Sequence, residues 1–200
     1  MKIWHREAIG GNWDKFGKLQ YDFLLDKGLK SHHYLLDLGC GSLRGGVLFI
    51  PYLEDRHYYG VEKEPRLLEA AQVELKEYKI EKIPLLFHIE NFDLSPIDAE
   101  FDFMLAQSVL THLRPNMIEL CLSKVVPKLK EDGHFYATFH HMGKTPRKGS
   151  FNRHPWRRNE VGRAEYKFEF FEELAEKFGI KITNLGKWGH PASSMLDITK

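Results

Sequence analysis

The sequence has little cysteine, no long apolar run and almost no excess of charge of either sign. Its two cysteines, Cys40 and Cys121, are too few and too far apart for the disulfide framework of a small secreted protein, which favours a reducing compartment. No stretch approaches the roughly 18 apolar residues that a membrane-spanning helix needs. The charged N-terminal residues lack the apolar core of a signal peptide. We therefore expect a cytoplasmic protein without a membrane partner.

The composition is that of an ordinary globular domain. A formal net charge of +1 gives no overall field that would attract nucleic acid or a membrane surface. The hydrophobic fraction of 42% and the charged fraction of 28% are typical of such domains, and 200 residues suffice for one sizeable core. The eleven histidines form neither an H-x-x-x-H nor an H-E-x-x-H pattern, so we predict no metal site.

Apolar runs and helical spacings alternate from Tyr34 to Phe178. Strands are expected at residues 34–38, 58–62, 85–89, 101–106, 134–139, 180–185 and 195–199, with a turn at Asp132-Gly133. Helices are expected at residues 16–27, 43–50 and 168–178, and after Pro65 and Pro115. The pattern predicts an α/β fold: a doubly wound, mostly parallel seven-stranded sheet with helices on both faces and an antiparallel edge strand.

Residues 1–33 are expected to form an N-terminal helical cap, and residues 34–200 the main domain. The main domain carries a segment at about 143–163 without periodicity, which we interpret as a long loop. Between Lys144 and Arg163 this segment has seven basic residues and a single acid, Glu160. Three interpretations stay open: a solvated surface loop, a lid over an anionic substrate, or a contact for nucleic acid. One loop is too small a basis for predicting a nucleic-acid partner.

The most informative segment runs from Asp37 to Gly46, where the first expected strand ends and a helix begins. Gly39 and Gly41 allow a tight turn and let a ligand approach the backbone closely. The helix that follows has N–H groups without partners in its first turn. Because ligands of such folds bind beyond the carboxyl ends of the strands, the segment predicts a ligand site there.

Two cofactor classes fit a glycine turn of this kind, dinucleotides and S-adenosylmethionine. A dinucleotide site needs a third small residue where this sequence has Arg44, and it binds a pyrophosphate that Asp37 would repel. An acid at Asp37 suits a cationic group better, such as the ammonium of S-adenosylmethionine. Glu62 follows Gly41 by 21 residues and can accept both ribose hydroxyls, which serves either cofactor.

These motifs resemble those of the class I, Rossmann-like S-adenosylmethionine-dependent methyltransferases. The resemblance covers the chain from about Tyr34 to its end and rests on the D-x-G-x-G turn, the acid that ends the second strand, and Leu129 to Gly133. A closer likeness to uncharacterised bacterial members rests on residues 10–13, 19–20, 39–46, 107–113 and 136–139. The resemblance implies S-adenosylmethionine as the cofactor.

The resemblance also implies which residues meet the cofactor: Asp37, Gly39, Cys40, Gly41, Ser42, Glu62, Asn91, Phe92, Gln107 and Ser108. The glycine turn would border the methionine part, Asp37 its ammonium, and Glu62 the ribose. The turn after the third strand would flank the adenine, and the acid expected there corresponds to Glu90, Asn91 or Asp93. The residues after the fourth strand would face the methyl donor. They lack the Asn/Asp-Pro-Pro-aromatic motif of nucleic-acid amino-methyltransferases, which argues against N-methylation of a base.

Three histidines lie where the fourth and fifth strands should end. Methyl transfer from a sulfonium has a neutral leaving group, so such an enzyme mainly aligns donor and acceptor, with a base where the acceptor is a poorly ionised hydroxyl. His112, His140 and His141 are the candidate catalytic bases, and a structural role is the alternative for each. Adjacent residues on a strand point to opposite faces, so at most one of His140 and His141 should face the acceptor.

The sequence therefore predicts methyl transfer from S-adenosylmethionine to an oxygen, or alternatively a nitrogen, of a small-molecule acceptor. Under the lid interpretation, the basic segment at 143–163 implies an anionic acceptor. Two other functions stay open: a nicotinamide-dependent oxidoreductase on a similar fold, and a non-catalytic protein that binds S-adenosylmethionine.

Overall fold

The computed structural model describes residues 4–142, 156–158 and 163–200. Its helices are α1 (Trp4–Ala8), α2 (Trp13–Asp26), α3 (Gly46–Tyr52), α4 (Pro65–Glu77), α5 (Pro115–Val125) and α6 (Glu169–Phe178), with 3-10 turns η1 (Leu110–His112) and η2 (Val126–Lys128). Its strands are β1 (Leu35–Leu38), β2 (Tyr58–Glu62), β3 (Leu85–His88), β4 (Phe101–Ala106), β5 (Leu129–His141), β6 (Trp156–Arg158), β7 (Ala164–Tyr166), β8 (Lys181–Lys187) and β9 (Ser194–Thr199). None of the helices described here is both long and apolar enough to cross a membrane.

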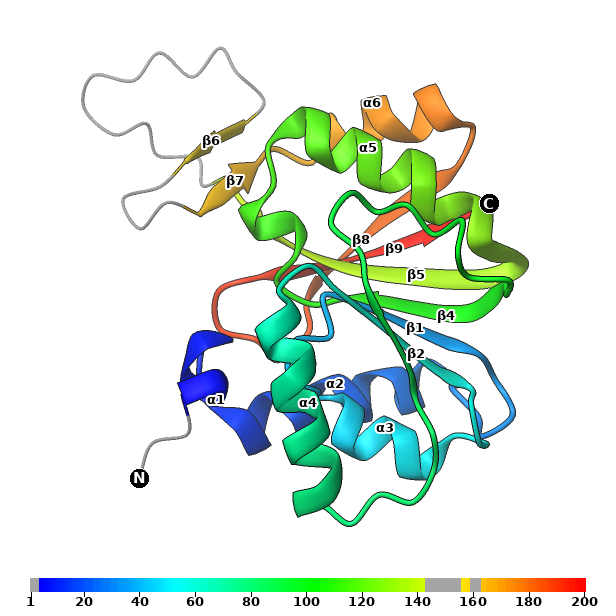
Figure 1. Ribbon diagram of the computed structural model, residues 1–200. Helices are drawn as coiled ribbons and strands as arrows, with labels where there is room; N and C mark the ends of the chain where they lie inside the picture. Colours follow the sequence, from blue (N-terminus) through cyan, green and yellow to red (C-terminus); the bar gives the residue numbers. More distant parts are fainter. Residues whose placement is uncertain (1–3, 143–155, 159–162) are drawn as a thin grey trace.

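Parallel strands form the centre of the sheet in the order β3-β2-β1-β4-β5. β9 pairs antiparallel with β5, and β8 pairs antiparallel with β9, so the last two strands extend the sheet beyond β5 (Figure 1). This confirms the predicted α/β fold with an antiparallel pair at one edge. β9, which runs against the other strands of this sheet, lies second from that edge, and β8 lies outside it.

Alternate side chains of each strand fill two cores, one on each face of the sheet. β5 sends Phe135 and Phe139 toward α5 and α6, and Tyr136 into the core that α2 and α3 share. In Figure 1, α5 and α6 lie above the sheet and α2, α3 and α4 lie below it. Because the central strands are parallel, their carboxyl ends meet at one edge of the sheet, between the two layers of helices.

The fifth strand is longer than the sequence predicted. β5 begins at Leu129 and includes Asp132 and Gly133, which were expected to form a turn. Its pairing with β4 shifts register between Phe101 and Phe103. A Cβ at Gly133 would lie 2.8 Å from the carbonyl oxygen of Phe101. The turn prediction was wrong because glycine serves close approach of two strands at this position.

Most of the basic segment, at 143–155 and 159–162, lies outside the described residues. The lid interpretation concerns these residues and therefore also falls outside what the structure describes. Residues 156–158 are not in a loop, because they form β6, which pairs antiparallel with β7. β7 in turn pairs with His140 and His141 at the end of β5. The loop prediction was wrong for β6 because a strand of 3 residues is too short to show a period.

The N-terminal helices pack against the rest of the domain through polar and aromatic contacts. Arg6 on α1 donates two hydrogen bonds to Glu74 on α4, at 2.7 and 2.6 Å. Its guanidinium also lies 4.5 Å from the ring centre of Trp13 on α2. The indole N–H of Trp13 donates to the hydroxyl of Tyr78 at 2.9 Å. These contacts hold the segment between α1 and α2 beside the carboxyl end of β1.

Candidate active site

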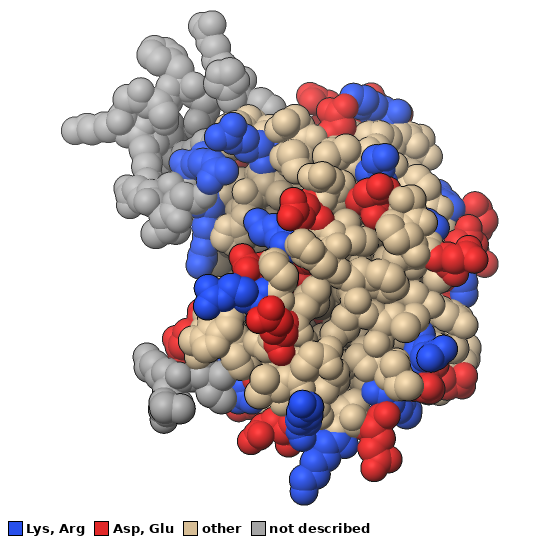
Figure 2. All heavy atoms as spheres, in the orientation of Figure 1, with Lys and Arg blue, Asp and Glu red and all other residues tan. Residues whose placement is uncertain are grey.

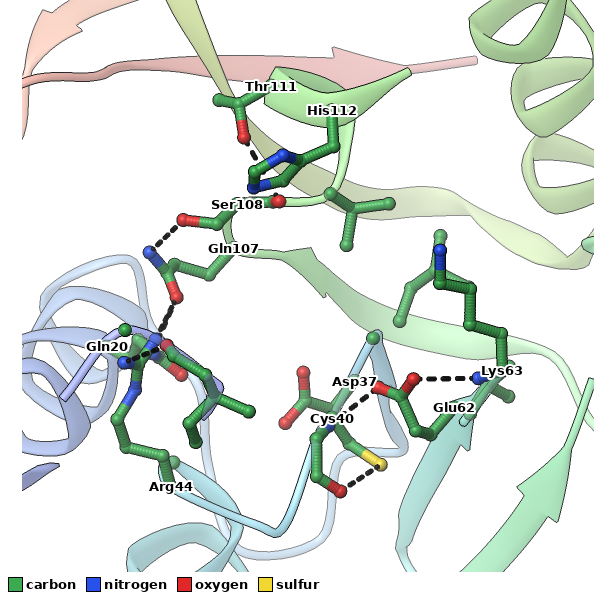
Figure 3. Close-up of a pocket in the computed structure, with 18 of the residues that line it drawn as sticks. Gln20, Asp37, Cys40, Arg44, Glu62, Lys63, Gln107, Ser108, Thr111 and His112 are labelled. Atoms are coloured by element: carbon green, nitrogen blue, oxygen red, sulfur yellow. Dashed lines mark hydrogen bonds between the residues drawn. The ribbon is translucent and has the colours of Figure 1, made fainter. Parts of the chain in front are cut away.

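A cavity of about 470 Å³ lies at the carboxyl ends of β1, β2, β4 and β5, the edge where sheets of this type bind ligands. Figure 3 shows its polar side chains and the hydrogen bonds between them. Ten of the thirteen residues predicted from the sequence line it: Asp37, Gly39, Cys40, Gly41, Glu62, Phe92, Gln107, Ser108, His112 and His140. Residues from distant parts of the chain therefore converge on one site.

The turn after β1 has no room for side chains at its two glycines. Gly39 and Gly41 have φ of +76° and +58°, in the left-handed region that favours glycine. A Cβ at Gly39 would lie 2.6 Å from Cγ2 of Val109, and one at Gly41 would lie 3.1 Å from Cγ2 of Ile9. The backbone itself thus borders the cavity at this turn.

Asp37 places a buried carboxylate at the end of β1. It is 4% exposed, and its Oδ2 accepts a hydrogen bond of 2.6 Å from the hydroxyl of Tyr58 on β2, its one such partner among the described residues. Burial raises the pKa of Asp37 to about 6, against the lowering effects of Tyr58 and Arg44. A cation bound in the cavity would stabilise the ionised form of this carboxylate.

Glu62 at the end of β2 holds the glycine turn in place. Its Oε2 accepts a hydrogen bond from the N–H of Gly41 at 3.0 Å, and its Oε1 accepts from the N–H of Lys63 at 2.9 Å (Figure 3). Oε1 also accepts from the N–H of Glu64 at 2.9 Å. Oε1 thereby uses both of its lone pairs, whereas Oε2 keeps one. Glu62 can therefore accept a hydrogen bond from a hydroxyl group in the cavity through Oε2 while it fixes the turn.

Arg44, which the sequence analysis used only against a dinucleotide, is the centre of a buried network. Its Nη1 donates to the carbonyl oxygens of Ile9 at 3.0 Å and Gly11 at 3.2 Å. Its Nη2 donates to Oε1 of Gln107, which also accepts from Nε2 of Gln20 at 3.2 Å (Figure 3). Burial lowers the pKa of Arg44 to about 10, so the guanidinium stays charged at neutral pH. The network joins the N-terminal segment, the glycine turn and the end of β4.

The chain turns sharply after β4 at Ser108, whose φ is +62°. Its N–H donates to Oγ1 of Thr138 on β5 at 2.7 Å, and its hydroxyl oxygen accepts from Nε2 of Gln107 at 2.7 Å. Its carbonyl oxygen accepts from the hydroxyl of Thr111 at 3.0 Å. A left-handed conformation costs a residue with a side chain roughly 1–2 kcal/mol. These three bonds offset that cost and hold Gln107 and Ser108 at the cavity.

Three of the predicted residues do not line the cavity. Ser42 is fully buried, and its hydroxyl forms a hydrogen bond of 3.0 Å with Nδ1 of His5 on α1. Asn91 and His141 are exposed. In the turn after β3, Glu90 and Phe92 line the cavity and Asn91 does not.

Two of the three candidate histidines line the cavity. His140 at the end of β5 is 8% exposed, and its Nδ1 lies 2.7 Å from the carbonyl oxygen of Ala192. His112 lies in η1, and burial followed by the positive charge of Arg163 lowers its pKa. Because β5 continues through His141, the alternation of the strand turns that side chain away from the cavity, as expected for adjacent residues.

Sequence reasoning missed the residues that the N-terminal segment and the β8–β9 turn bring to the cavity. Ile9, Phe16 and Gln20 line it from the first, and His190 lines it from the second. Gln20 had a signal, since it belongs to a motif on which the resemblance rests. Ile9 and His190 had none, because their positions depend on the packing of segments far apart in the sequence.

Positive groups concentrate at the end of the cavity that His112 and His190 line. Burial, then positively charged neighbours that include Arg163, lower the pKa of both histidines. Figure 2 shows Lys and Arg side chains gathered at the left of this face, where the surface is hollowed. Among the residues that the structure describes, no cluster of His, Cys, Asp and Glu could hold a metal ion.

The span that carries this site matches a known family of domains. A model of the methyltransferase domain family matches residues 36–135, which is half of the chain. The match begins in β1 and ends within β5. It includes the glycine turn, Glu62, and Gln107 with Ser108.

Solved structures share the fold at low sequence identity. An S-adenosylmethionine-dependent methyltransferase from Clostridium acetobutylicum ATCC 824 has a TM-score of 0.69 and 13% identity over 96% of this chain and 93% of that chain. Magnesium protoporphyrin IX methyltransferase from Synechocystis PCC 6803, with bound S-adenosylmethionine, has a TM-score of 0.67 and 14% identity over 93% of this chain and 81% of that chain. The glycopeptide N-methyltransferase MtfA has a TM-score of 0.67 and 14% identity over 92% of this chain and 89% of that chain. At these identities the likeness establishes a common fold.

Proposed function

The chain belongs to the methyltransferase domain family, and on that premise we propose that it transfers a methyl group to an oxygen, or alternatively a nitrogen, of a small-molecule acceptor. It is a class I, Rossmann-like methyltransferase, and its cofactor is S-adenosylmethionine. The observation that carries the proposal is the buried carboxylate of Asp37 beside a glycine turn, in a cavity that Glu62 also lines.

The residues of the cavity fit that cofactor. Gly39 and Gly41 keep the backbone open to a ligand, because a Cβ at either would fill space against Val109 or Ile9. The carboxylate of Asp37 would bind the ammonium group of the methionine part. Glu62 would accept a hydrogen bond from a ribose hydroxyl through the remaining lone pair of its Oε2. Phe92, in the turn after β3, would flank the adenine.

The reaction depends mainly on the alignment of methyl donor and acceptor. Bound in the cavity, S-adenosylmethionine supplies a methyl group on a sulfonium whose departure leaves a neutral thioether. The hydrogen bonds among Arg44, Gln107 and Ser108 fix the side of the cavity that would meet donor and acceptor. A poorly ionised hydroxyl would also need a base. We propose His140 or His112 for that role and leave out His141, which does not line the cavity.

The charges at the histidine end support an anionic acceptor. The pKa of His112 is lowered by burial and then by Arg163, His140, Lys63 and Arg158, all of them cationic or able to become so. An anionic group on the acceptor would be stabilised in that surrounding. The N-terminal residues up to 33 would act as a cap, since Ile9, Phe16 and Gln20 close the cavity on the side of the glycine turn.

Calorimetry with S-adenosylmethionine, its demethylated product and NAD tests the cofactor. We expect the first two to bind and NAD not to bind, because Asp37 would repel a pyrophosphate and Arg44 stands where a dinucleotide site needs a small residue. A methyl-transfer assay with labelled cofactor, on small hydroxyl and amine compounds that carry a carboxylate or phosphate, tests the reaction. Binding of NAD alone would contradict the assignment of the cofactor. Cofactor binding without transfer to any compound would favour a non-catalytic binding protein. Mass spectrometry of small molecules that co-purify with the protein would direct the choice of acceptors.

A further inference from the structure

Two histidines from distant parts of the chain line the same cavity, and one residue, Ala192, binds both of them. His140 ends β5, and His190 lies in the turn between β8 and β9. The carbonyl oxygen of Ala192 lies 2.7 Å from Nδ1 of His140. The N–H of Ala192 donates to Nδ1 of His190 at 3.2 Å. Ala192 therefore meets the same ring nitrogen of both histidines, once as an acceptor and once as a donor.

These contacts fix opposite tautomers in the two rings. A carbonyl oxygen can only accept, so Nδ1 of His140 carries a hydrogen, and in the neutral ring its Nε2 has a free lone pair. An amide N–H can only donate, so Nδ1 of His190 keeps its lone pair, and its Nε2 carries the hydrogen. In each ring Nε2 is the nitrogen left for a ligand, as an acceptor in His140 and as a donor in His190.

A second set of hydrogen bonds is compatible with this tautomer of His190. The indole N–H of Trp188 can only donate, and it does so to Oγ of Ser193 at 3.2 Å. Oγ of Ser193 lies 3.0 Å from Nδ1 of His190. Because Ala192 makes that nitrogen an acceptor, the hydroxyl of Ser193 donates to it and shares its one lone pair with the N–H of Ala192. Burial and neighbouring positive groups, first His140 and then Arg44, lower the pKa of His190. The ring is therefore neutral near physiological pH, and its Nε2 is a donor without a net charge.

We infer that His140 and His190 together recognise a hydroxyl group, which makes the acceptor of the proposed methyl transfer an alcohol or phenol. A hydroxyl has one hydrogen and two lone pairs, so it can donate to His140, accept from His190 and keep a lone pair for attack. A neutral amine has one lone pair, and the hydrogen bond from His190 would occupy it. A carboxylate has no hydrogen for Nε2 of His140. This assignment rests on the proposed function and chooses between the two reacting atoms that it left open.

The two rings also have distinct parts in the transfer. The hydroxyl oxygen forms a bond to the methyl carbon, and the pair of the broken carbon–sulfur bond stays on the neutral thioether. The hydroxyl proton passes to Nε2 of His140, which becomes an imidazolium, while its Nδ1–H stays bound to Ala192. His190 donates to the same oxygen and stabilises the negative charge that develops as the proton leaves. The ring of Phe16, with its centre 4.7 Å from that of His190, packs against it and limits its movement.

Nitrogen-15 NMR of histidine-labelled protein tests the tautomers directly. Spectra are recorded without ligand and with the demethylated cofactor, and His140→Gln and His190→Gln assign the two rings. We expect Nδ1–H in His140 and Nε2–H in His190. Ser193→Ala should leave both tautomers unchanged, because the N–H of Ala192 still donates to Nδ1 of His190. His134→Gln, six residues before His140 on β5, should also change neither. The same tautomer in both rings, or a charged ring near neutral pH, would overturn the inference.

Recognition of the hydroxyl group is tested in the same NMR experiment with millimolar phenol and aniline, which are a matched hydroxyl and amine compound. We expect phenol to shift the Nε2 resonances of both rings and aniline to shift them less. No shift with phenol, or an equal shift with aniline, would also overturn the inference. Failure of the proposed function would look different, because the protein would then not bind S-adenosylmethionine in calorimetry, whatever the tautomers of the two histidines.

Discussion

The hydroxyl of Tyr58 donates to Oδ2 of Asp37 across 2.6 Å, at the one place where the carboxyl end of β1 carries a buried charge. This hydrogen bond offsets only part of the cost of burial, since the pKa of Asp37 is still raised to about 6. Without a ligand, the protein therefore holds an ionised group near neutral pH that weakens the folded state. Binding of a cation in the cavity removes that cost. Asp37 therefore lowers the stability of the ligand-free fold at a position where it serves ligand binding.

Asp37→Asn should stabilise the ligand-free protein near neutral pH. The asparagine oxygen still accepts from Tyr58, but the buried charge is gone. The folded-state pKa of about 6 lies above the ordinary 3.8, so the cost of Asp37 is complete above the first value and fades as pH falls toward the second. We expect the variant to gain roughly 1–3 kcal/mol in the free energy of unfolding near neutral pH and little below the lower value. Urea unfolding at both pH values measures this, and a less stable variant near neutral pH would contradict it.

The same carboxyl group should make cofactor binding depend on pH. The ammonium of S-adenosylmethionine pairs with the ionised form of Asp37, so wild-type affinity should rise as pH increases through about 6. Asp37→Asn should bind at least roughly tenfold more weakly near neutral pH, which corresponds to about 1.4 kcal/mol. Its affinity should also vary less across that range. Calorimetry over a pH series decides, and equal pH dependence in both proteins would assign the effect to another group.

The parts of the fold that follow from local pattern could be predicted, and those that depend on distant contacts could not. β2 and β4 have the predicted bounds, because each is an apolar run between clear turn or helix signals. The glycine turn and Glu62 were found because a ligand-binding backbone imposes a local signature. His190 and the network of Arg44 were missed, since a contact across 63 residues to Gln107 leaves no trace in local periodicity.

Gly41→Ala should weaken cofactor binding more than its effect on stability explains. Gly41 and Gly179 have similar φ, +58° and +62°, but a Cβ at Gly41 would meet Ile9 at 3.1 Å while one at Gly179 has open space. Both variants should lose about 1–2 kcal/mol in the free energy of unfolding from backbone strain. Only Gly41→Ala should lower the affinity for S-adenosylmethionine, measured by calorimetry. An equal loss of affinity in Gly179→Ala would show that the effect is general destabilisation.

Arg44→Lys should loosen the N-terminal segment although the charge is kept. A lysine ammonium cannot reproduce the fork that binds the carbonyl oxygens of Ile9 and Gly11 together with Gln107. We expect a loss of roughly 1–3 kcal/mol, because buried acceptors lose their donors. Hydrogen exchange should rise in residues 4–20, and cofactor affinity should fall. The exposed Arg56→Lys is the control. Unchanged exchange in that segment would mean that α1 is held by its contacts to Glu74 alone.

Among the three candidate bases, His140→Ala should lower turnover most. Nε2 of His140 keeps a free lone pair because Nδ1 is bound to Ala192, and the ring lines the cavity. Loss of a general base typically costs roughly 10²–10⁴-fold in rate. His112→Ala should have a smaller effect, since no hydrogen bond fixes its ring among the described residues. His141→Ala should stay near wild type, because its side chain is exposed and does not line the cavity.

Turnover and cofactor affinity have to be measured separately for these histidine variants. A base changes the rate of transfer, whereas a residue that shapes the pocket also changes the affinity for S-adenosylmethionine. His140→Ala should therefore bind the cofactor like the wild type and lose the limb of the pH–rate profile that reports deprotonation of the base. An acceptor that ionises at neutral pH should be methylated by His140→Ala at nearly the wild-type rate. If the variant is equally slow with ionised and un-ionised acceptors, His140 positions the acceptor and takes no proton, and alignment alone accounts for catalysis.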